Sequence, residues 1–290
     1  MNSGMGDRTS TGRPVALVTG ASRGIGREVA LGLAAAGLDV AFTGRTRVEG
    51  EGSVPPRTQR EGDRRIAVPG SLATTDAAVR DHGVRSLPLP MDLLDLDSVR
   101  AAADAVLAEW GRVDVVVNNA IAHLPHARFL ELDPATLRES LEANHVSQVV
   151  LLQRLLPAMV DAGGGVVVDL VSGSVVNEPP APPGEGGWGL AYSSAKAAFG
   201  RVAGAVNAEF RSRGVRAYNL DPGFVVTEAA AARGGTGAIA DRGFATTPLD
   251  AAARAVVHLV GCPEPDTHLG RTIRATEWLA DPPACGEDGA

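Results

Sequence analysis

A phenol and an amine lie four residues apart in the segment YSSAK, which places Tyr192 four residues before Lys196. On a helix, residues four apart lie on one face, so the Lys196 ammonium would lie close to the Tyr192 hydroxyl. A free tyrosine is a weak acid with a pKa of about 10, and a neighbouring positive charge lowers that pKa. The pair is therefore suited to give a proton to an oxygen that becomes negative, as when hydride reduces a carbonyl group.

A glycine-rich loop near the start of the chain has the features of a phosphate cradle. The segment VALVTGASRGIGREVALGLAAAG reads as a strand, a loop and an amphipathic helix. Gly20 allows a tight turn off the strand, while Gly24 and Gly26 let backbone N–H groups approach a pyrophosphate at the positive end of the helix. The loop residues of this predicted nucleotide site are Gly20, Ser22, Arg23, Gly24, Ile25 and Gly26.

The elements that would position these groups follow an alternating pattern. Short β-branched runs bounded by turn residues recur between alanine-rich helical stretches, which is typical of a parallel sheet covered by helices on both faces. We expect one α/β domain with a Rossmann-type, doubly wound sheet of seven parallel strands. The predicted strands lie near residues 15–19, 39–43, 86–91, 113–117, 166–171, 215–220 and 271–275.

Two segments interrupt this rhythm. Residues 47–68 are rich in Gly, Pro, Arg and Glu, and we expect a solvated surface excursion; the alternative is a contact with cofactor phosphate. Residues 177–190 combine Pro and Gly and predict a structured loop that carries Trp188. Neither segment splits the chain, so we predict one domain over 14–276, a disordered tail over 1–13 and a C-terminal tail over 277–290.

The composition excludes several classes of function. The net charge of −7 argues against a general nucleic-acid or anionic-membrane binder, since those partners need a basic face. Cys262 and Cys285 are too few for a disulfide framework, and no apolar stretch reaches the ~20 residues of a membrane helix, so we expect a soluble, cytoplasmic protein. His123, His126 and His145 lack partners at metal-ligand spacing, and no metal site is predicted.

The motifs together resemble the short-chain dehydrogenase/reductase family, in the branch whose glycine motif reads TGxxxGxG. The likeness covers roughly residues 14–276. It rests on TGASRGIG at 19–26, MDLLD at 91–95, NNA at 118–120, Asn144, a serine near 172, YSSAK at 192–196 and DPGFVVTE at 221–228. The stretch that follows VPGSLATT also looks like a subgroup with an enlarged connection after the second strand.

This resemblance implies a catalytic group built around Tyr192 and Lys196. Ser172 follows the strand at 166–171 and would hold the substrate carbonyl, with Ser174 as the competing candidate because the loop before Tyr192 is long. Asn144 matches the position that supports a water chain to the lysine; a buried structural asparagine is the alternative. No G-x-S-x-G nucleophile elbow occurs, so the predicted chemistry converges on Tyr192.

The resemblance also implies a nicotinamide cofactor, and the second strand bears on which one. That strand ends in Thr43, Gly44 and Arg45 without the acid that NAD sites place there, so Arg45 and Arg23 are predicted to bind the 2′-phosphate of NADP. Alternatively both are surface arginines, and Glu49 or Glu51 serves a ribose. The cofactor residues implied beyond the glycine loop are Arg45, Asp92, Asn118, Ala120, Tyr192, Lys196, Pro222, Gly223 and Thr227.

The sequence therefore predicts an NADP(H)-preferring enzyme, with NAD(H) as the alternative, that interconverts a small ketone or aldehyde and an alcohol. Competing interpretations are a non-catalytic NADPH-binding sensor, enoyl reduction and epimerisation. Helices around 135–160 and 191–212 would pair to form a homodimer or homotetramer. A lid rich in small residues would follow Thr227, and the candidate pocket walls are Ile121, Trp188, Phe224 and Phe244.

Overall fold

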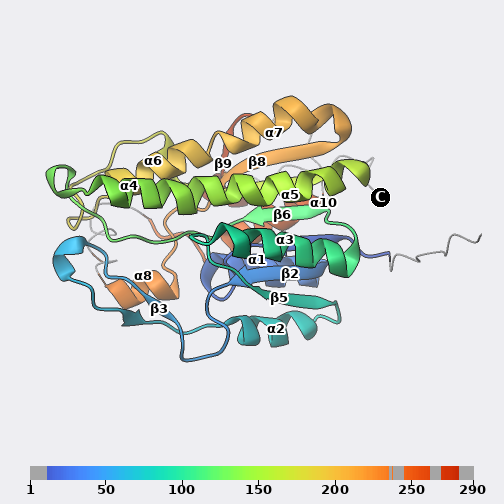
Figure 1. The fold of residues 1–290 in the computed structure, drawn as a ribbon, viewed down its shortest axis with the longest axis horizontal. Helices are drawn as coiled ribbons and strands as arrows, with labels where there is room; N and C mark the ends of the chain where they lie inside the picture. The colour runs from blue at the N-terminus through green and yellow to red at the C-terminus, as the bar shows by residue number, and fades with distance from the viewer. Residues whose placement is uncertain (1–11, 235–236, 238–244, 262–268, 281–290) are drawn as a thin grey trace, which may run out of the picture.

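Seven short strands form a parallel sheet at the centre of the molecule (Figure 1), as the sequence predicted. The computed structural model describes residues 12–234, 237, 245–261 and 269–280. Every pair of neighbouring strands in this sheet is parallel. In sheet order the strands are β5 (Ser86–Pro90), β2 (Asp39–Gly44), β1 (Val15–Val18), β6 (Val115–Asn118), β7 (Gly165–Leu170), β8 (Val215–Asp221) and β9 (Thr272–Arg274).

The inner strands are apolar because helices cover both of their faces. All four residues of β1 and of β6 are buried. A strand with one solvated face would alternate polar and apolar residues, whereas a strand buried on both faces reads as a continuous apolar run. This explains why VALV and VVVN mark the middle of the sheet.

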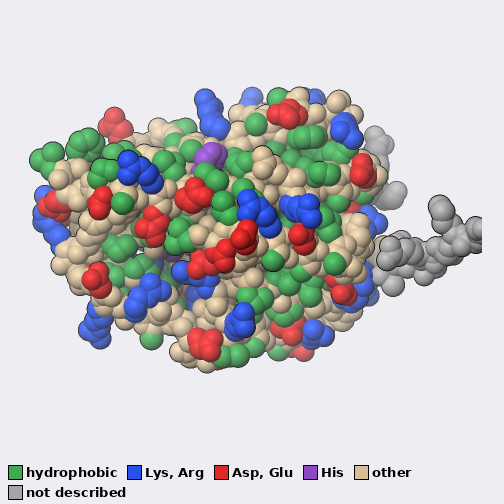
Figure 2. Space-filling model, in the orientation of Figure 1, with side chains coloured by type: hydrophobic (Ala, Val, Ile, Leu, Met, Phe, Trp, Pro, Cys, Tyr) green, Lys and Arg blue, Asp and Glu red, His purple; other side chains and the backbone are tan. Residues whose placement is uncertain are grey.

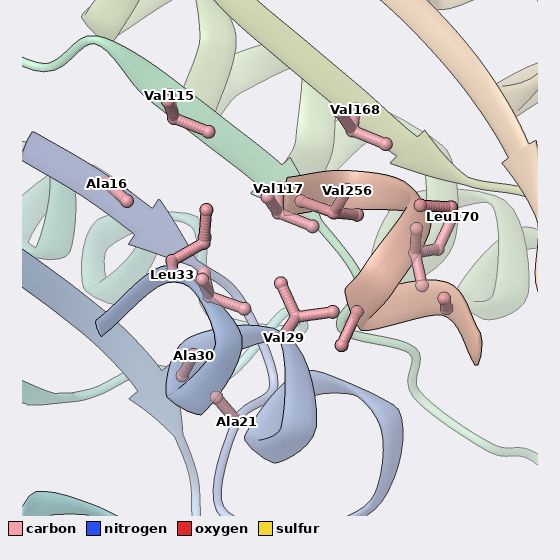
Figure 3. Packing of buried hydrophobic residues seen from close by; sticks show 14 of the residues in the cluster. Ala16, Ala21, Val29, Ala30, Leu33, Val115, Val117, Val168, Leu170 and Val256 are labelled. Carbon is pink, nitrogen blue, oxygen red and sulfur yellow. The ribbon is translucent and has the colours of Figure 1, made fainter. Parts of the chain in front are cut away.

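Two helical layers enclose the sheet. The cluster drawn in Figure 3 joins Val29 and Leu33 to Val117 of β6 and to Val256 of a later helix. The helices that bury apolar side chains in this first cluster are α1 (Gly24–Ala35), α2 (Leu72–Arg80), α10 (Ala251–Gly261) and α11 (Ala275–Ala280). Those that do so in the second cluster, across the sheet, are α3 (Leu96–Trp110), α5 (Ser147–Asp161), α6 (Leu190–Phe199) and α7 (Val202–Phe210).

The remaining elements lie around the edges of these layers. A hairpin of β3 (Ser53–Val54) and β4 (Ile66–Ala67) forms a separate two-stranded sheet within residues 47–68. Short 3₁₀ turns and one π-helical turn at Glu142–Val146 complete the described chain. The other helices are α4 (Pro134–Leu141) and α8 (Glu228–Arg233).

The ordered domain continues past the predicted boundary at residue 276. Trp278 in α11 is 6 % exposed, belongs to the first core cluster and packs edge-on against the His258 ring at 5.0 Å. Only the last two residues of the predicted 1–13 tail are described, and there Arg13 donates to the Gly83 carbonyl at 2.8 Å. Residues 1–11 of that tail, residues 281–290 of the predicted C-terminal tail, and Phe244, Cys262 and Cys285 lie outside the described residues.

Across the residues that the structure describes, no helix is both long and apolar enough to cross a bilayer. On the face drawn in Figure 2, acidic and basic side chains are interspersed rather than gathered by sign.

Candidate functional site

The strand order creates a crevice between β1 and β6. After β1 the chain builds the sheet outwards through β2 and β5, then returns to β6 and builds in the opposite direction. Thr19 joins the two strand ends, because its hydroxyl accepts hydrogen bonds from the backbone N–H groups of Asn119 and Ala120, both at 3.0 Å. A cleft of about 460 Å³ opens there, at the reversal point where open α/β sheets bind ligands.

The glycine loop forms the floor of this cleft through close backbone approach. Gly20 has a φ of +71°, and a Cβ there would lie 2.7 Å from the Cα of Ala120. A Cβ at Gly26 would lie 2.4 Å from the Gly20 carbonyl oxygen. Helix α1 begins at Gly24, and within the described chain no side chain caps its first turn. Its backbone donors therefore stay available to an anion, and the cleft fits the pyrophosphate of a dinucleotide.

Most of the predicted cofactor residues line this cleft. Asn118 does not: it is 1 % exposed, and its amide donates to Asp169 at 2.8 Å, so the neighbouring Asn119 takes its place on the cleft wall. Pro222 and Gly223 follow β8 at the same edge of the sheet. The predicted residues that line the cleft are Gly20, Ser22, Arg23, Gly24, Ile25, Gly26, Arg45, Asp92, Ala120 and Thr227.

Arg23 has a structural role that the sequence did not indicate. Its Nε donates to the Pro69 carbonyl at 2.7 Å, and its Nη2 donates to the Gly70 carbonyl at 2.7 Å and to Thr46 Oγ1 at 2.9 Å. The Glu49 carboxylate accepts from the Gly70 N–H. Three donor contacts of Arg23 thus hold the residues on either side of the 47–68 segment against the glycine loop, while the exposed Arg45 lines the cleft.

The connection segment, residues 47–68, is more than the solvated excursion we expected. Val54 and Val68 are buried in a small cluster with Ala229 of α8. Glu51, Ser53, Val54 and Arg65 line the cleft. The polar composition misled the prediction because two buried valines are enough to pack this hairpin against α8. The alternative of a cofactor contact agrees better with the structure, because four residues of the segment line the cleft.

Tyr192 and Lys196 lie on α6, beside the carboxyl end of β7. Lys196 is 6 % exposed, and its ammonium donates to the Leu170 carbonyl at 2.6 Å. Burial lowers the pKa of Lys196 to about 8, against the opposing effects of Asp169 and Asp221. Burial is the largest influence on Tyr192 and raises its pKa, so the lowering expected from Lys196 does not dominate.

Of the two candidate serines, Ser172 is the better placed. Hydrogen bonding from Ser172 is the largest influence that lowers the pKa of Tyr192, and Ser174 has a smaller one. The Ser172 hydroxyl also accepts the Ser174 N–H at 3.2 Å, which orients it. The Ser174 hydroxyl is buried, with no partner at ordinary hydrogen-bond distance among the described residues, so we regard it as the more distant neighbour.

Asn144 lies in the π-helical turn Glu142–Val146 between α4 and α5. Its side-chain oxygen accepts the Ala122 N–H at 2.7 Å, and its amide donates to the Ala122 carbonyl at 3.1 Å. Such turns are frequent at functional sites. Here the turn aims Asn144 at the segment that follows β6, and its bonds to Ala122 link α4 and α5 to the cleft wall.

Asp169 is a buried acid that the sequence did not single out. It is fully buried on β7, and burial raises its pKa to about 7, although the bond from Asn118 and the charge of Lys196 act in the opposite direction. The folded chain therefore holds an extra proton between about pH 4 and pH 7, and this group's contribution to stability is lost as the pH rises through that window.

Asp169→Asn should consequently stabilise the protein at pH 8, by up to about 4 kcal/mol, and have little effect near pH 4. The neutral amide needs no charge in the interior and still offers Asn118 an oxygen. Urea unfolding at both pH values measures the difference. A variant that is less stable than the wild type at pH 8 would contradict this account.

Residues 14–80 and 57–236 match the family described as short chain dehydrogenase. A relative named D-threitol dehydrogenase, from Mycolicibacterium smegmatis, is 32 % identical over 215 residues, which covers 74 % of this chain and 71 % of that protein. The chain belongs to the short-chain dehydrogenase family.

Solved structures agree with this assignment at the level of the fold. A short chain dehydrogenase from Mycobacterium paratuberculosis bound to NAD has a TM-score of 0.71 and 22 % identity, over 91 % of this chain and 98 % of that one. An alcohol dehydrogenase from Thermococcus sibiricus complexed with 5-hydroxy-NADP has a TM-score of 0.67 and 24 % identity, over 90 % and 95 %. The family match and the D-threitol dehydrogenase relative, rather than the ligands of these structures, make this short-chain dehydrogenase an NAD(P)-dependent oxidoreductase.

Proposed function

We propose that the protein interconverts a small ketone or aldehyde and the corresponding alcohol, with Tyr192 as the proton donor and acceptor. The observation that carries this proposal is the position of Tyr192 beside Ser172, at the sheet edge that also carries the glycine-lined cleft. A proton donor and a hydroxyl at that edge suit an oxygen that becomes an alkoxide as hydride is transferred.

Each residue has a definite part in this scheme. The bound cofactor supplies or accepts the hydride. The Ser172 hydroxyl donates to the substrate oxygen, and the Tyr192 hydroxyl gives that oxygen its proton. Lys196, held by the Leu170 carbonyl, supplies positive charge near the phenol, and the Asn144 segment supports the wall beside it. Carbonyl chemistry needs this set of donors, whereas a binding protein does not.

The test is turnover. We expect NADPH absorbance to fall with a panel of ketones, and NADP⁺ to be reduced with the corresponding alcohols. Tight cofactor binding without turnover on any carbonyl compound would favour the non-catalytic sensor, and turnover confined to conjugated alkenes would favour enoyl reduction.

We also propose a preference for NADP(H), with Arg45 as the main determinant. The residue is exposed in the cleft directly after β2, whereas Arg23 already donates through Nε and Nη2 to the carbonyls of Pro69 and Gly70, just after the connection segment. Structural neighbours are complexed with NAD or with an NADP derivative, so both remain possible for the family. Glu51 also lines the cleft and is the candidate partner for a ribose if NAD is preferred.

Arg45→Ala should therefore weaken NADPH binding by about tenfold or more and leave NADH binding within about twofold, because an arginine–phosphate pair is strong and directional. Fluorescence titration with both cofactors measures this. Arg47→Ala, an exposed neighbour outside the cleft lining, is the matched control. Equal losses for the two cofactors would show that Arg45 does not discriminate between them.

The partner, assembly and location remain proposals as well. Ile121 lines the cleft and is the best supported of the candidate substrate walls. An apolar groove of about 560 Å³ runs between α5 and α7, with Leu152, Leu156 and Val206 among its lining, which supports pairing of these helices in a homodimer or homotetramer. The cytoplasmic location rests on the low cysteine content.

A further inference from the structure

The connection segment is tied to α8 as well as to the glycine loop. Arg233, the last residue of α8, donates to the Pro55 carbonyl at 2.9 Å. In the opposite direction, Arg57 donates to the Gly234 carbonyl just after α8. Together with the cluster of Val54, Val68 and Ala229, these bonds fix the segment against α8, where Val54 and Ala229 line the cleft.

From there the segment reaches the loop that follows β6. The His126 N–H donates to the Arg57 carbonyl at 2.8 Å, and the Gln59 N–H donates to the His126 carbonyl at 3.0 Å. Thr58 and His126 thereby form an isolated parallel β-bridge. Both backbone polar groups of His126 are thus held by a segment more than sixty residues earlier in the chain.

The side chain of His126 packs against the proton donor. Its ring lies edge-on to the Tyr192 ring, with centroids 5.9 Å apart and planes at 77°. The imidazole also lies near Gly189, at the start of α6, where an added Cβ would be 3.4 Å from Nδ1. An edge-on neighbour restricts rotation of the phenol ring and excludes water from one flank of it.

We propose that His126 is a positioning residue for Tyr192 and that the connection segment holds His126 in place. The inference rests on the proposed role of Tyr192 in proton transfer. The phenol must present its hydroxyl to the substrate oxygen, and small misplacements in such geometry are costly to the rate. A segment that lines the cofactor cleft therefore also sets the geometry of the proton donor.

The electrostatic surroundings give the role a signature in the pH profile. The groups nearest Tyr192 are the hydroxyls of Ser172 and Ser174, the carboxylate of Asp221 and the imidazole of His126. The Lys196 ammonium lies one turn further along α6, and His123, whose pKa burial lowers to about 3, lines the same small cavity. Burial together with Arg233 and Arg57 lowers the pKa of His126 to about 4, so the imidazole is neutral in the working range. Removing the neutral His126 ring would let water reach Tyr192 and would lower the pKa of the Tyr192 hydroxyl.

The first test compares His126→Ala with His126→Phe. We expect the alanine variant to lower kcat about tenfold with KM within about twofold, and to move the alkaline limb of the kcat profile to lower pH. Phenylalanine keeps an edge-on ring and should restore kcat to within about threefold. Equal losses of kcat in both variants would mean that the imidazole itself acts in the chemistry. A wild-type kcat in His126→Ala would mean that His126 does not position Tyr192. Either result overturns the proposal.

The second test separates the backbone bridge from the side chain. Gln59 is exposed and begins a 3₁₀ turn after the extended Thr58, a position that accepts proline. Gln59→Pro deletes the N–H that His126 accepts, whereas Gln59→Ala keeps it. We expect the proline variant alone to show a severalfold loss of kcat with the same shift in pH profile. Identical behaviour of the two variants would overturn the role of the segment.

Tyr192→Phe separates this inference from the function on which it rests. If that variant stays active, the proposed function fails. If it is inactive while His126→Ala matches the wild type, only the positioning role fails.

Discussion

Tyr192→Phe is expected to lower kcat by about a thousandfold while leaving cofactor affinity within about twofold. The phenol hydroxyl is the proposed proton donor, and a positioned general acid contributes about 10²- to 10⁴-fold to a rate. The ring that packs against His126 is retained, and the cofactor cleft is lined by other residues, so neither folding nor binding should change. Single-turnover absorbance of NADPH together with a fluorescence titration measures both quantities.

The serine pair provides the internal comparison for this result. Ser172→Ala should lower kcat by about a hundredfold, since the hydroxyl stabilises the developing alkoxide. Ser174→Ala should have a small effect, because its hydroxyl has the weaker influence on Tyr192. A full loss at Ser174 with normal activity at Ser172 would reverse the assignment of the catalytic serine.

Gly20→Ala is expected to abolish cofactor binding, with affinity reduced at least about a hundredfold, and to destabilise the fold by several kcal/mol. Two costs combine at this position. The φ of +71° disfavours any side chain by about 1 kcal/mol, and the added Cβ would lie 2.7 Å from the Ala120 Cα, so the ends of β1 and β6 must separate. The cleft opens between those two strand ends.

Gly37→Ala isolates the first of these costs. Gly37 follows α1 with a φ of +89°, and no heavy atom of the described residues lies within 4 Å of an added Cβ. We expect a loss of about 1 kcal/mol and unchanged cofactor affinity. Denaturant unfolding and fluorescence titration of both variants give the comparison; if the two behave alike, crowding against Ala120 is not what makes Gly20 necessary.

Much of the fold was predictable because local patterns determine it. The strands around Val115 and Val166 are continuous apolar runs, and such runs form buried parallel strands wherever helices flank them. The pairing of Tyr192 and Lys196 on one helix follows from their spacing alone. The glycine loop was equally predictable, since its strand, turn and helix are contiguous in the chain.

The long-range contacts at the site could not be predicted in the same way. Arg23 binds the carbonyls of Pro69 and Gly70, and a carbonyl acceptor is present at every residue, so no side chain marks the partner. The contacts of His126 with the connection segment were unpredictable for the same reason, because they join backbone groups that every residue carries. The position of Trp278 in the core depends on how α11 returns to the sheet, which its short helical sequence does not reveal.

The π-helical turn at Glu142–Val146 has a consequence for chain length. One extra residue is accommodated in an otherwise continuous helical rod that runs from Pro134 to Asp161. Each residue of a regular helix advances the side chains by about 100°. Because the π turn absorbs its extra residue without changing the registers of α4 and α5, deleting one residue from it would restore a regular helix between them, and inside the turn it would rotate Asn144 by about that angle, away from Ala122. The direction in which Asn144 points is therefore set by a residue count, and a point substitution outside that turn would leave it unchanged.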